Sequence, residues 1–503
     1  MRFCKNAQLI GALIRIMRDM NSAKVRIIPG GRDPDAYARL TSAVCHALSE
    51  YQAGGRPAPL MVVDPHMDLH QLRSELARYE IRAHTGLLMR TSGSASGYGK
   101  LVELSWASII ASARASDEAM GGPGMWISSL PVHHIAGFNV VVRSVLAGCE
   151  PLCIPSHMDH IQGDGVGASD GAGGECGDGD APHCAVGDSL PARLVSVHTS
   201  INNARSTGLR VYWAQVPLQL SRLVGHEQTK EKDFLSLLTS VDSILVGGAA
   251  LSEHICAQAQ RQGLHVVRSY GSTETCGGCT YDGIPLGDTQ IYLEADGRIC
   301  VAGAVVALGY ATCTHEERAR KQLNHAQCAA ETDNEEQADP AFIWKLPESP
   351  HVHPSRVQKG SPQETKPQYV RVHRTRDIGR WSHGRLVICG RLDDSIITGG
   401  VTVMPREVEN IMSTLWHTEV VVVGVPDPVW GQAVVAVTAA DLLSSEVRTL
   451  LKSRCEPGWV PRHVLSLSSL GGAWPLGSSG KIDRRALAAR AAQYLGDQQY
   501  LES

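Results

Sequence analysis

The chain has 503 residues, of which 43% are hydrophobic and 19% are charged, and its formal net charge is −4. This length exceeds one ordinary hydrophobic core, so two or more domains are expected. The composition excludes a disordered chain, and the nearly balanced charge gives no general electrostatic reason to expect nucleic-acid or membrane binding.

Residues 1–20 are basic and mildly amphipathic. Their apolar run is too short for a signal peptide and lacks a clean cleavage site of small residues. No stretch of the chain reaches the roughly 18 uninterrupted apolar residues that a membrane helix needs. We therefore expect a cytoplasmic protein without stable membrane insertion. The 14 cysteines show no disulfide-framework spacing, which favours reduced thiols.

Apolar, β-branched runs alternate with helical patterns through most of the chain, which indicates α/β layers with largely parallel strands. Five such runs are expected to be strands: Leu60–Asp64, Met125–Leu130, Arg210–Trp213, Ser243–Val246 and His265–Tyr270.

A loop rich in small residues runs from Thr91 to Lys100 (TSGSASGYGK). Glycines and hydroxyl residues let backbone N–H groups approach an anion, and Lys100 adds positive charge. The Walker A pattern fails here, because five residues separate Gly93 from Gly99 and a leucine follows the lysine. Taken alone, a loop of serines and glycines is more often a flexible turn.

Two segments, 156–190 and 314–368, are predicted to be mobile surface insertions. The first is rich in Gly and Asp, and the second is polar, charged and contains proline. Cys176, His183 and Cys184 in the first could bind a metal, and Cys276 and Cys279 have zinc or redox spacing. Reduced thiols are the preferred interpretation for both groups, and the Cys276–Cys279 pair has no second CxxC to complete a zinc site.

The segment YGSTET, from Tyr270 to Thr275, follows a predicted strand, and open α/β sheets bind ligands at strand ends. Thr273 supplies a hydroxyl, and Glu274 supplies a hard carboxylate oxygen that suits Mg²⁺. Upstream, the strand in LVGGAAL (245–251) ends in small residues that leave room for a flat ring.

Two later segments carry further polar candidates. In RTRDIG (374–379), the Asp377 carboxylate could accept hydrogen bonds from both hydroxyls of a ribose. Arg391 could supply hydrogen-bond donors in a fixed geometry beside it. In GSSGKIDR (477–484), Lys481 is flanked by glycine on a mobile turn. Each of these alone could be an ordinary turn or surface salt bridge.

After residue 384 the pattern changes to that of a compact α+β unit. Strands are expected at Arg385–Cys389, Ser395–Ile397, Val420–Val425 and Ala433–Thr438, with a helix at Pro405–Leu415. The predicted domains are therefore 1–390, a large layered α/β domain, and 391–503, a small α+β domain.

Together and in this order, the segments TSGS…GK, YGSTE, TRDIG, GRLDD…TGG and SGKIDR resemble the adenylate-forming superfamily of acyl-CoA synthetases, adenylation domains and luciferases. The resemblance runs from about Thr91 to Leu487. It implies an enzyme that uses ATP, Mg²⁺ and coenzyme A, with residues 1–390 binding ATP and acid and residues 391–503 acting as a mobile lid.

The resemblance also implies roles for single residues. Lys481 would bridge the substrate carboxylate and the α-phosphate, Glu274 and Thr273 would position Mg²⁺ and that phosphate, and Asp393 would be the hinge of the lid. Nucleotide and CoA contacts would come from Thr91, Ser92, Gly93, Ser94, Ser96, Gly97, Lys100, Gly248, Ala249, Tyr270, Gly271, Asp377, Arg391, Gly399 and Gly400.

The substrate is expected to be an acid. LPVHHIAG (130–137) is similar to the superfamily segment whose histidine lines the acid pocket, here His134, with a packed core histidine as the alternative. Further pocket candidates are Arg143, Ser272, Gly277 and Gly278. The segments 247–251 and 270–287 resemble actinobacterial o-succinylbenzoate–CoA ligases of menaquinone biosynthesis. In that case Cys276 and Cys279 belong to the pocket loop, with no metal.

The sequence leaves other functions open: another aryl- or acyl-CoA ligase, an enzyme that loads a carrier protein, or a non-catalytic nucleotide-binding protein. Several positions depart from the superfamily pattern, notably an extra residue at Ala95-Ser96, Gly99 in place of Pro, Arg376 in place of Gly, and Thr402 in place of Lys. None removes Glu274, Asp377, Arg391 or Lys481, so an active enzyme is expected. Small molecules are the expected partners, and a homodimer is left open.

Overall fold

The computed structural model describes residues 25–91, 99–154, 190–225, 237, 239–314, 342–343, 371–456, 458–477 and 481–502. The N-terminal segment 1–20 and the cysteine–histidine group of the first insertion lie outside these residues. So do both predicted insertions, apart from residues 190, 314 and 342–343.

The first sheet has the strand order β1-β2-β4-β5-β15. Its first three strands run parallel, and β5 and β15 continue it in antiparallel fashion. The strands are β1 (Arg26–Pro29), β2 (Leu60–Val63), β4 (Leu87–Arg90), β5 (Leu101–Leu104) and β15 (Gly309–Tyr310). A separate pair joins β3 (Tyr79–Glu80) to β16 (Thr312–Cys313).

The second sheet has seven strands in the order β12-β11-β10-β9-β8-β6-β7. The run from β10 to β7 is parallel, and β11 and β12 close one edge in antiparallel fashion. The strands are β6 (Gly124–Ser128), β7 (Leu152–Cys153), β8 (Arg210–Gln215), β9 (Ser243–Val246), β10 (Val266–Ser272), β11 (Gly277–Tyr281) and β12 (Ile284–Pro285). Four of the predicted strands lie here, and the fifth is β2.

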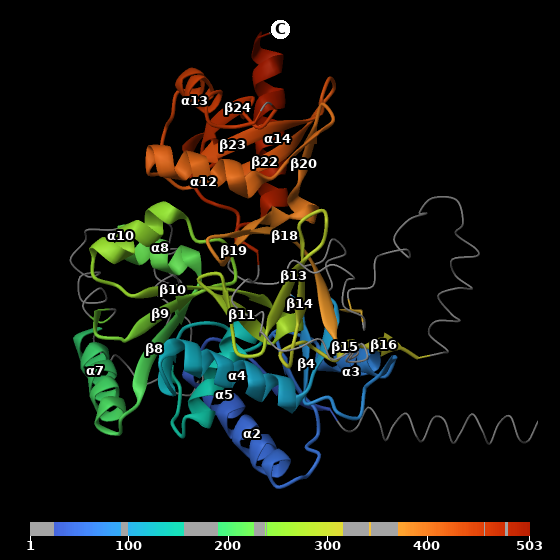
Figure 1. Ribbon diagram of the computed structural model, residues 1–503, viewed down its shortest axis with the longest axis vertical. Helices are drawn as coiled ribbons and strands as arrows, with labels where there is room; N and C mark the ends of the chain where they lie inside the picture. The colour runs from blue at the N-terminus through green and yellow to red at the C-terminus, as the bar shows by residue number, and fades with distance from the viewer. Residues whose placement is uncertain are drawn as a thin grey trace, which may run out of the picture.

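Helices fill the space between these sheets and cover their outer faces (Figure 1). The inner layer consists of α2 (Pro34–Gln52), α4 (Trp106–Met120) and α5 (Ile135–Leu146). The outer helices are α3 (Leu69–Leu76) on the first sheet and α7 (Leu190–Ser206), α8 (Pro217–Gly225) and α10 (Glu253–Arg261) on the second. The start of α2 is set by its local sequence. Asp33 caps the helix by accepting a hydrogen bond from the Ala36 N–H at 2.8 Å, and Pro34 occupies the first helical position.

A third sheet lies beside the other two, in the order β13-β14-β18-β17 with β19 paired to β18. Its strands are β13 (Gln290–Leu293), β14 (Arg298–Ala302), β17 (Phe342–Ile343), β18 (Val372–Ser382) and β19 (Arg385–Arg391). The short strand β17 falls inside the segment predicted to be an insertion, and it pairs with β18 through Phe342 and His373.

The C-terminal unit lies above the orange strands β18 and β19 in Figure 1, in deeper orange and red. Its sheet contains β20 (Ile396–Thr398), β21 (Val401–Val403), β22 (Val420–Asp427), β23 (Gly431–Thr438) and β24 (His463–Ser466). One face packs on α12 (Pro405–Trp416) and α13 (Ser444–Leu451), and the other packs on α14 (Arg484–Glu502). The predicted α/β class with a smaller α+β unit is confirmed. The boundary at residue 391 stays a prediction.

Of the helices in the described part of the chain, none combines the length and the apolar character needed to cross a membrane.

Candidate functional site

Asp377 on β18 is held by groups from two other strands, at the place where the second and third sheets meet. Its Oδ2 accepts a hydrogen bond from the Tyr270 hydroxyl at 2.8 Å, and its Oδ1 accepts one from Arg391 Nη1 at 3.2 Å. Asp377 and Arg391 are register partners on β18 and β19. Burial and the nearby Asp377 carboxylate raise the pKa of Tyr270, so its hydroxyl stays a donor. The carboxylate is therefore fixed in orientation.

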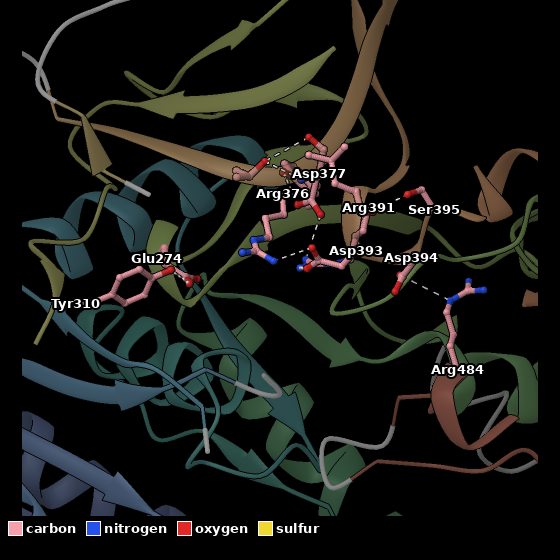
Figure 2. A network of polar contacts seen from close by, with 12 residues as sticks. Glu274, Tyr310, Arg376, Asp377, Arg391, Asp393, Asp394, Ser395 and Arg484 are labelled. Carbon is pink, nitrogen blue, oxygen red and sulfur yellow. Dashed lines mark hydrogen bonds and ion pairs between the residues drawn. The ribbon is translucent and has the colours of Figure 1, made fainter. Parts of the chain in front are cut away.

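Glu274 lies in the 3₁₀ turn η1 (Thr273–Thr275) directly after β10. The turn is closed by the Thr275 hydroxyl, which accepts a hydrogen bond from the Ser272 N–H at 2.9 Å, and by Cys276 in the left-handed region at φ 53°. Thr273 and Glu274 are both buried, and Glu274 Oε1 accepts a hydrogen bond from the Tyr310 hydroxyl at 2.8 Å. Figure 2 shows Tyr310 and Glu274 facing each other.

The two ends of the predicted phosphate loop are joined. The Thr91 N–H donates to Lys100 O at 2.9 Å, and the Lys100 N–H donates to Thr91 Oγ1 at 3.0 Å. A β-carbon on Gly99 would lie 1.9 Å from Thr91 O, so this close approach requires glycine where the superfamily commonly has proline. The loop residues Ser92, Gly93, Ser94, Ser96 and Gly97 lie outside the described residues.

Lys481 reaches from the C-terminal unit to the loop after β9. Its Cε lies 3.6 Å from the place of a β-carbon on Gly248, which has φ +84°. Burial and then the charge of Arg391 lower the pKa of Lys481, while Asp377 opposes this effect. The structure therefore brings Lys481 together with Gly248, Asp377 and Arg391. Ala249 lies exposed beside Gly248.

His134 stands at the start of α5, half-buried, with its ring 4.6 Å from that of His133. Burial, then His133 and Lys481, lower its pKa to about 4, so the imidazole is neutral at pH 7. One turn further along, Asn139 donates to the Cys276 carbonyl at 2.8 Å. Helix α5 is thereby joined to the loop after Glu274.

Glycines line this junction because side chains would not fit. A β-carbon on Gly277 would lie 2.3 Å from Asn139 Nδ2, and one on Gly278 would lie 2.3 Å from Ser269 Oγ. One on Gly271 would lie 1.9 Å from Gly277 O, across the β10–β11 hairpin. Ser272 is half-buried at the end of the same strand.

Known proteins with a similar sequence or structure bind AMP or form acyl-adenylates, as their names state. Residues 407–481 match the AMP-binding enzyme C-terminal domain. Over 92% of this chain, the structure is similar to o-succinylbenzoate CoA synthetase from Bacillus subtilis in complex with its acyl-adenylate intermediate, with a TM-score of 0.54, 20% identity and 87% coverage of that chain. The chain has the fold of the adenylate-forming enzymes. The resemblance expected from the motifs is confirmed.

Two further proteins extend the comparison. A probable 2-succinylbenzoate–CoA ligase of Mycobacterium tuberculosis is 28% identical over 467 residues, covering 90% of this chain and 96% of that protein. ATP-bound MatB from Rhodopseudomonas palustris has a TM-score of 0.58 at 15% identity, covering 93% of this chain and 88% of that one.

Mg²⁺ is the metal that an adenylate-forming fold implies, and Glu274 is suited to it. Mg²⁺ usually keeps several waters and is bound through one or two carboxylates together with substrate phosphates. Glu274 offers a buried carboxylate whose Oε1 is hydrogen-bonded to Tyr310, an arrangement that suits a cation arriving with ATP. In the described part of the chain, no group of three His, Cys, Asp or Glu side chains could hold a metal alone.

Cys276 and Cys279 are buried free thiols, and burial raises the pKa of Cys279 to about 12.

Lys481, Gly248, Asp377 and Arg391 form what we call the Lys481 cluster. Three predicted positions have their contacts elsewhere. Arg143 is buried in the inner helical layer, with its guanidinium 4.9 Å from the Trp126 ring. Gly399 and Gly400 form the exposed turn between β20 and β21, at φ +56° and +82°, and the Gly399 N–H donates to Trp430 O at 2.9 Å. Their roles as pocket and CoA contacts stay predictions.

The predicted hinge, Asp393, lies in the 3₁₀ turn η3 (Leu392–Asp394), which joins β19 to β20. Its carboxylate accepts hydrogen bonds from Arg376 at 2.8 Å and from Arg391 at 3.0 Å (Figure 2). Burial would raise the pKa of Asp393, but the two guanidinium groups outweigh it and hold the pKa below its ordinary value. Sequence reasoning had no signal for the Arg376 contact, nor for Tyr310 or Asn139, because their partners are distant in the chain.

Proposed function

We propose that this chain ligates o-succinylbenzoate to coenzyme A through an acyl-adenylate, releasing pyrophosphate and then AMP, in menaquinone biosynthesis. The observation that carries this proposal is the position of Lys481, which lies against Gly248 and close to Asp377 and Arg391. The names of the relatives, 2-succinylbenzoate–CoA ligases, support the choice of acid.

The first half-reaction joins two anions. A carboxylate is a poor acyl donor, so its oxygen attacks the α-phosphate of ATP and pyrophosphate departs. Cations and preorganised donors must screen the charge that builds up between these groups. In the proposal, Lys481 bridges the carboxylate and the α-phosphate. Asp377 and Arg391 hold the ribose. The loop that begins at Thr91 and ends at Lys100 binds the β- and γ-phosphates.

Glu274 and Thr273 would hold the Mg²⁺ that accompanies ATP. When bound, this ion neutralises charge on the phosphates. The acid pocket would be lined by the neutral His134 and the small residues Ser272, Gly277 and Gly278. The nucleotide would contact Tyr270, Gly271, Gly248 and Ala249.

In the second half-reaction the thiol of coenzyme A attacks the acyl carbon, and AMP leaves. We place the hinge for any movement of the C-terminal unit at Asp393, because this residue joins β19 to β20, and we place Gly399 and Gly400 along the CoA channel. The proposal includes a cytoplasmic location, and a homodimer stays a prediction.

The test is thioester formation followed by mass spectrometry. The enzyme is supplied with ATP, Mg²⁺ and coenzyme A together with o-succinylbenzoate, benzoate or octanoate. Product with o-succinylbenzoate alone supports the proposal. Product only with another acid retains the mechanism and rejects the substrate, and turnover only on an acyl-carrier protein rejects coenzyme A as the acceptor.

A further inference from the structure

Tyr310 contacts two charged groups of the site at once. Its hydroxyl donates to Glu274 Oε1 at 2.8 Å, and the Lys100 ammonium lies 4.8 Å from the centre of its ring. Lys100 ends the predicted phosphate loop, and Glu274 is the proposed magnesium ligand. One side chain therefore joins an anion and a cation that come from different sheets.

The backbone of Tyr310 is itself held in place. Strand β15 pairs with β5, and Arg82 Nη1 donates to the Tyr310 carbonyl at 3.1 Å. Arg82 is in turn fixed by Glu103, which is fully buried and accepts hydrogen bonds from Arg82 Nη1 at 2.6 Å and from its N–H at 2.8 Å. The Phe342 ring lies edge-on to Tyr310, with ring centres 5.3 Å apart. Tyr310 is thus a fixed support for the groups that it touches.

Each contact has a direct electrostatic effect. A hydrogen bond to one carboxylate oxygen sets the orientation of Glu274 and leaves the lone pairs of Oε2 for a cation. An aromatic face attracts an ammonium group, which restrains the flexible Lys100 side chain.

We propose that Tyr310 is a positioning residue for Mg²⁺–ATP, whose hydroxyl orients the Glu274 carboxylate and whose ring holds Lys100 at the end of the phosphate loop. This inference rests on the proposed function for the identity of the nucleotide. It assigns to Tyr310 no direct contact with substrate.

Two substitutions separate the contacts. Tyr310→Phe keeps the ring under Lys100 and removes the hydrogen bond to Glu274, while Tyr310→Leu removes both. The matched control is Tyr212→Phe, which removes a buried hydroxyl that donates to Met120 O at 2.9 Å, away from the Lys481 cluster. Calorimetric titration with ATP over a series of Mg²⁺ concentrations requires no acid and no turnover.

For Tyr310→Phe, we expect the Mg²⁺ concentration for half-maximal enhancement of ATP binding to rise roughly tenfold, as for loss of a hydrogen bond to a charged group. ATP affinity without Mg²⁺ should stay within about twofold. Tyr310→Leu should in addition weaken Mg²⁺-free ATP binding about threefold, the size of an exposed cation–π contact. Tyr212→Phe should change neither quantity. In a Glu274→Gln background, Tyr310→Phe should have no further effect on the Mg²⁺ dependence.

An unchanged Mg²⁺ dependence in Tyr310→Phe overturns the inference, and so does an equal loss of ATP binding with and without Mg²⁺. These outcomes are separate from the fate of the proposed function. If the wild-type chain binds Mg²⁺–ATP and forms no thioester, the ligase proposal fails and the role of Tyr310 is still decided by the titration.

Discussion

The Cε atom of Lys481 lies 3.6 Å from the point that a β-carbon on Gly248 would occupy, so the lysine of the C-terminal unit rests on the loop that follows β9. The other neighbour of that point is Val216 Cγ1 at 3.8 Å. A glycine in the left-handed region thus borders the side chain on which the proposed chemistry depends.

Substitution of Gly248 should therefore impair adenylation. Gly248→Ala places a methyl group beside Lys481 and forces a non-glycine residue to φ +84°, which costs about 1–2 kcal/mol. The methyl group itself would make an ordinary van der Waals contact with Lys481 at 3.6 Å, so the effect comes from the strained backbone, whose relief would shift the loop on which Lys481 rests. We expect acid-dependent pyrophosphate release to fall roughly 10- to 100-fold, because small misplacements of a catalytic group have effects of this order. Gly263→Ala is the control, since Gly263 has φ +79° and no atom near its would-be β-carbon. Equal kinetic losses in the two variants would show that backbone strain alone is responsible.

Lys481→Ala should separate the two half-reactions. Removal of the ammonium takes away the charge that screens the carboxylate and the α-phosphate, so adenylation should fall by roughly 10²-fold or more. Thioester formation from supplied acyl-adenylate should stay within a few-fold of the wild type. Rapid-quench measurement of each step checks this, and equal loss in both steps contradicts the assigned role.

The pH dependence of adenylation should also report on Lys481. Burial and Arg391 lower the pKa of Lys481, so its charge is present at low pH and is lost as pH rises through a value below the ordinary 10.5. Adenylation should decline on the alkaline side beginning below that value. Between the lowered pKa and 10.5 the unfolded chain binds more protons at this position, so its contribution to stability rises with pH. Lys481→Arg should remove the alkaline decline from whatever activity it retains.

The C-terminal unit depends on the ion pair between Glu409 and Arg484, which joins α12 to α14. Glu409 is buried, its oxygens lie 2.5 Å and 2.9 Å from the two Nη atoms of Arg484, and it accepts a hydrogen bond from the Val422 N–H at 2.8 Å. Glu409→Gln should lower the free energy of unfolding by up to about 3 kcal/mol, because Arg484 loses its nearest carboxylate and keeps only Asp394 at 3.9 Å and the Val422 carbonyl at 2.8 Å. Chemical denaturation measures this loss. Glu456→Gln, at an exposed position, should change stability by less than about 0.5 kcal/mol.

Much of the layered architecture could be predicted from local patterns. Buried parallel strands are largely apolar, and this pattern predicts β6, β8, β9 and β10. The antiparallel strand β22 is recognisable because its first residues, Val420–Val423, are all apolar and buried. The short strands β15 and β17 carry too few residues for a pattern. The sequence around β17 predicts a surface insertion, because the neighbours of Phe342 and Ile343 in the chain are mostly polar.

From local patterns taken together and in order, the sequence predicts which residues could carry the chemistry: Glu274 after its strand, Asp377, Arg391 and Lys481. Only the tertiary structure decided which side chains meet. Tyr310 reaches Glu274, Arg376 reaches Asp393, and the Arg143 guanidinium lies over the Trp126 ring in the inner layer. Local patterns reflect the period of a single helix or strand, whereas these contacts depend on how separate sheets pack against one another, and that packing depends on the whole core at once.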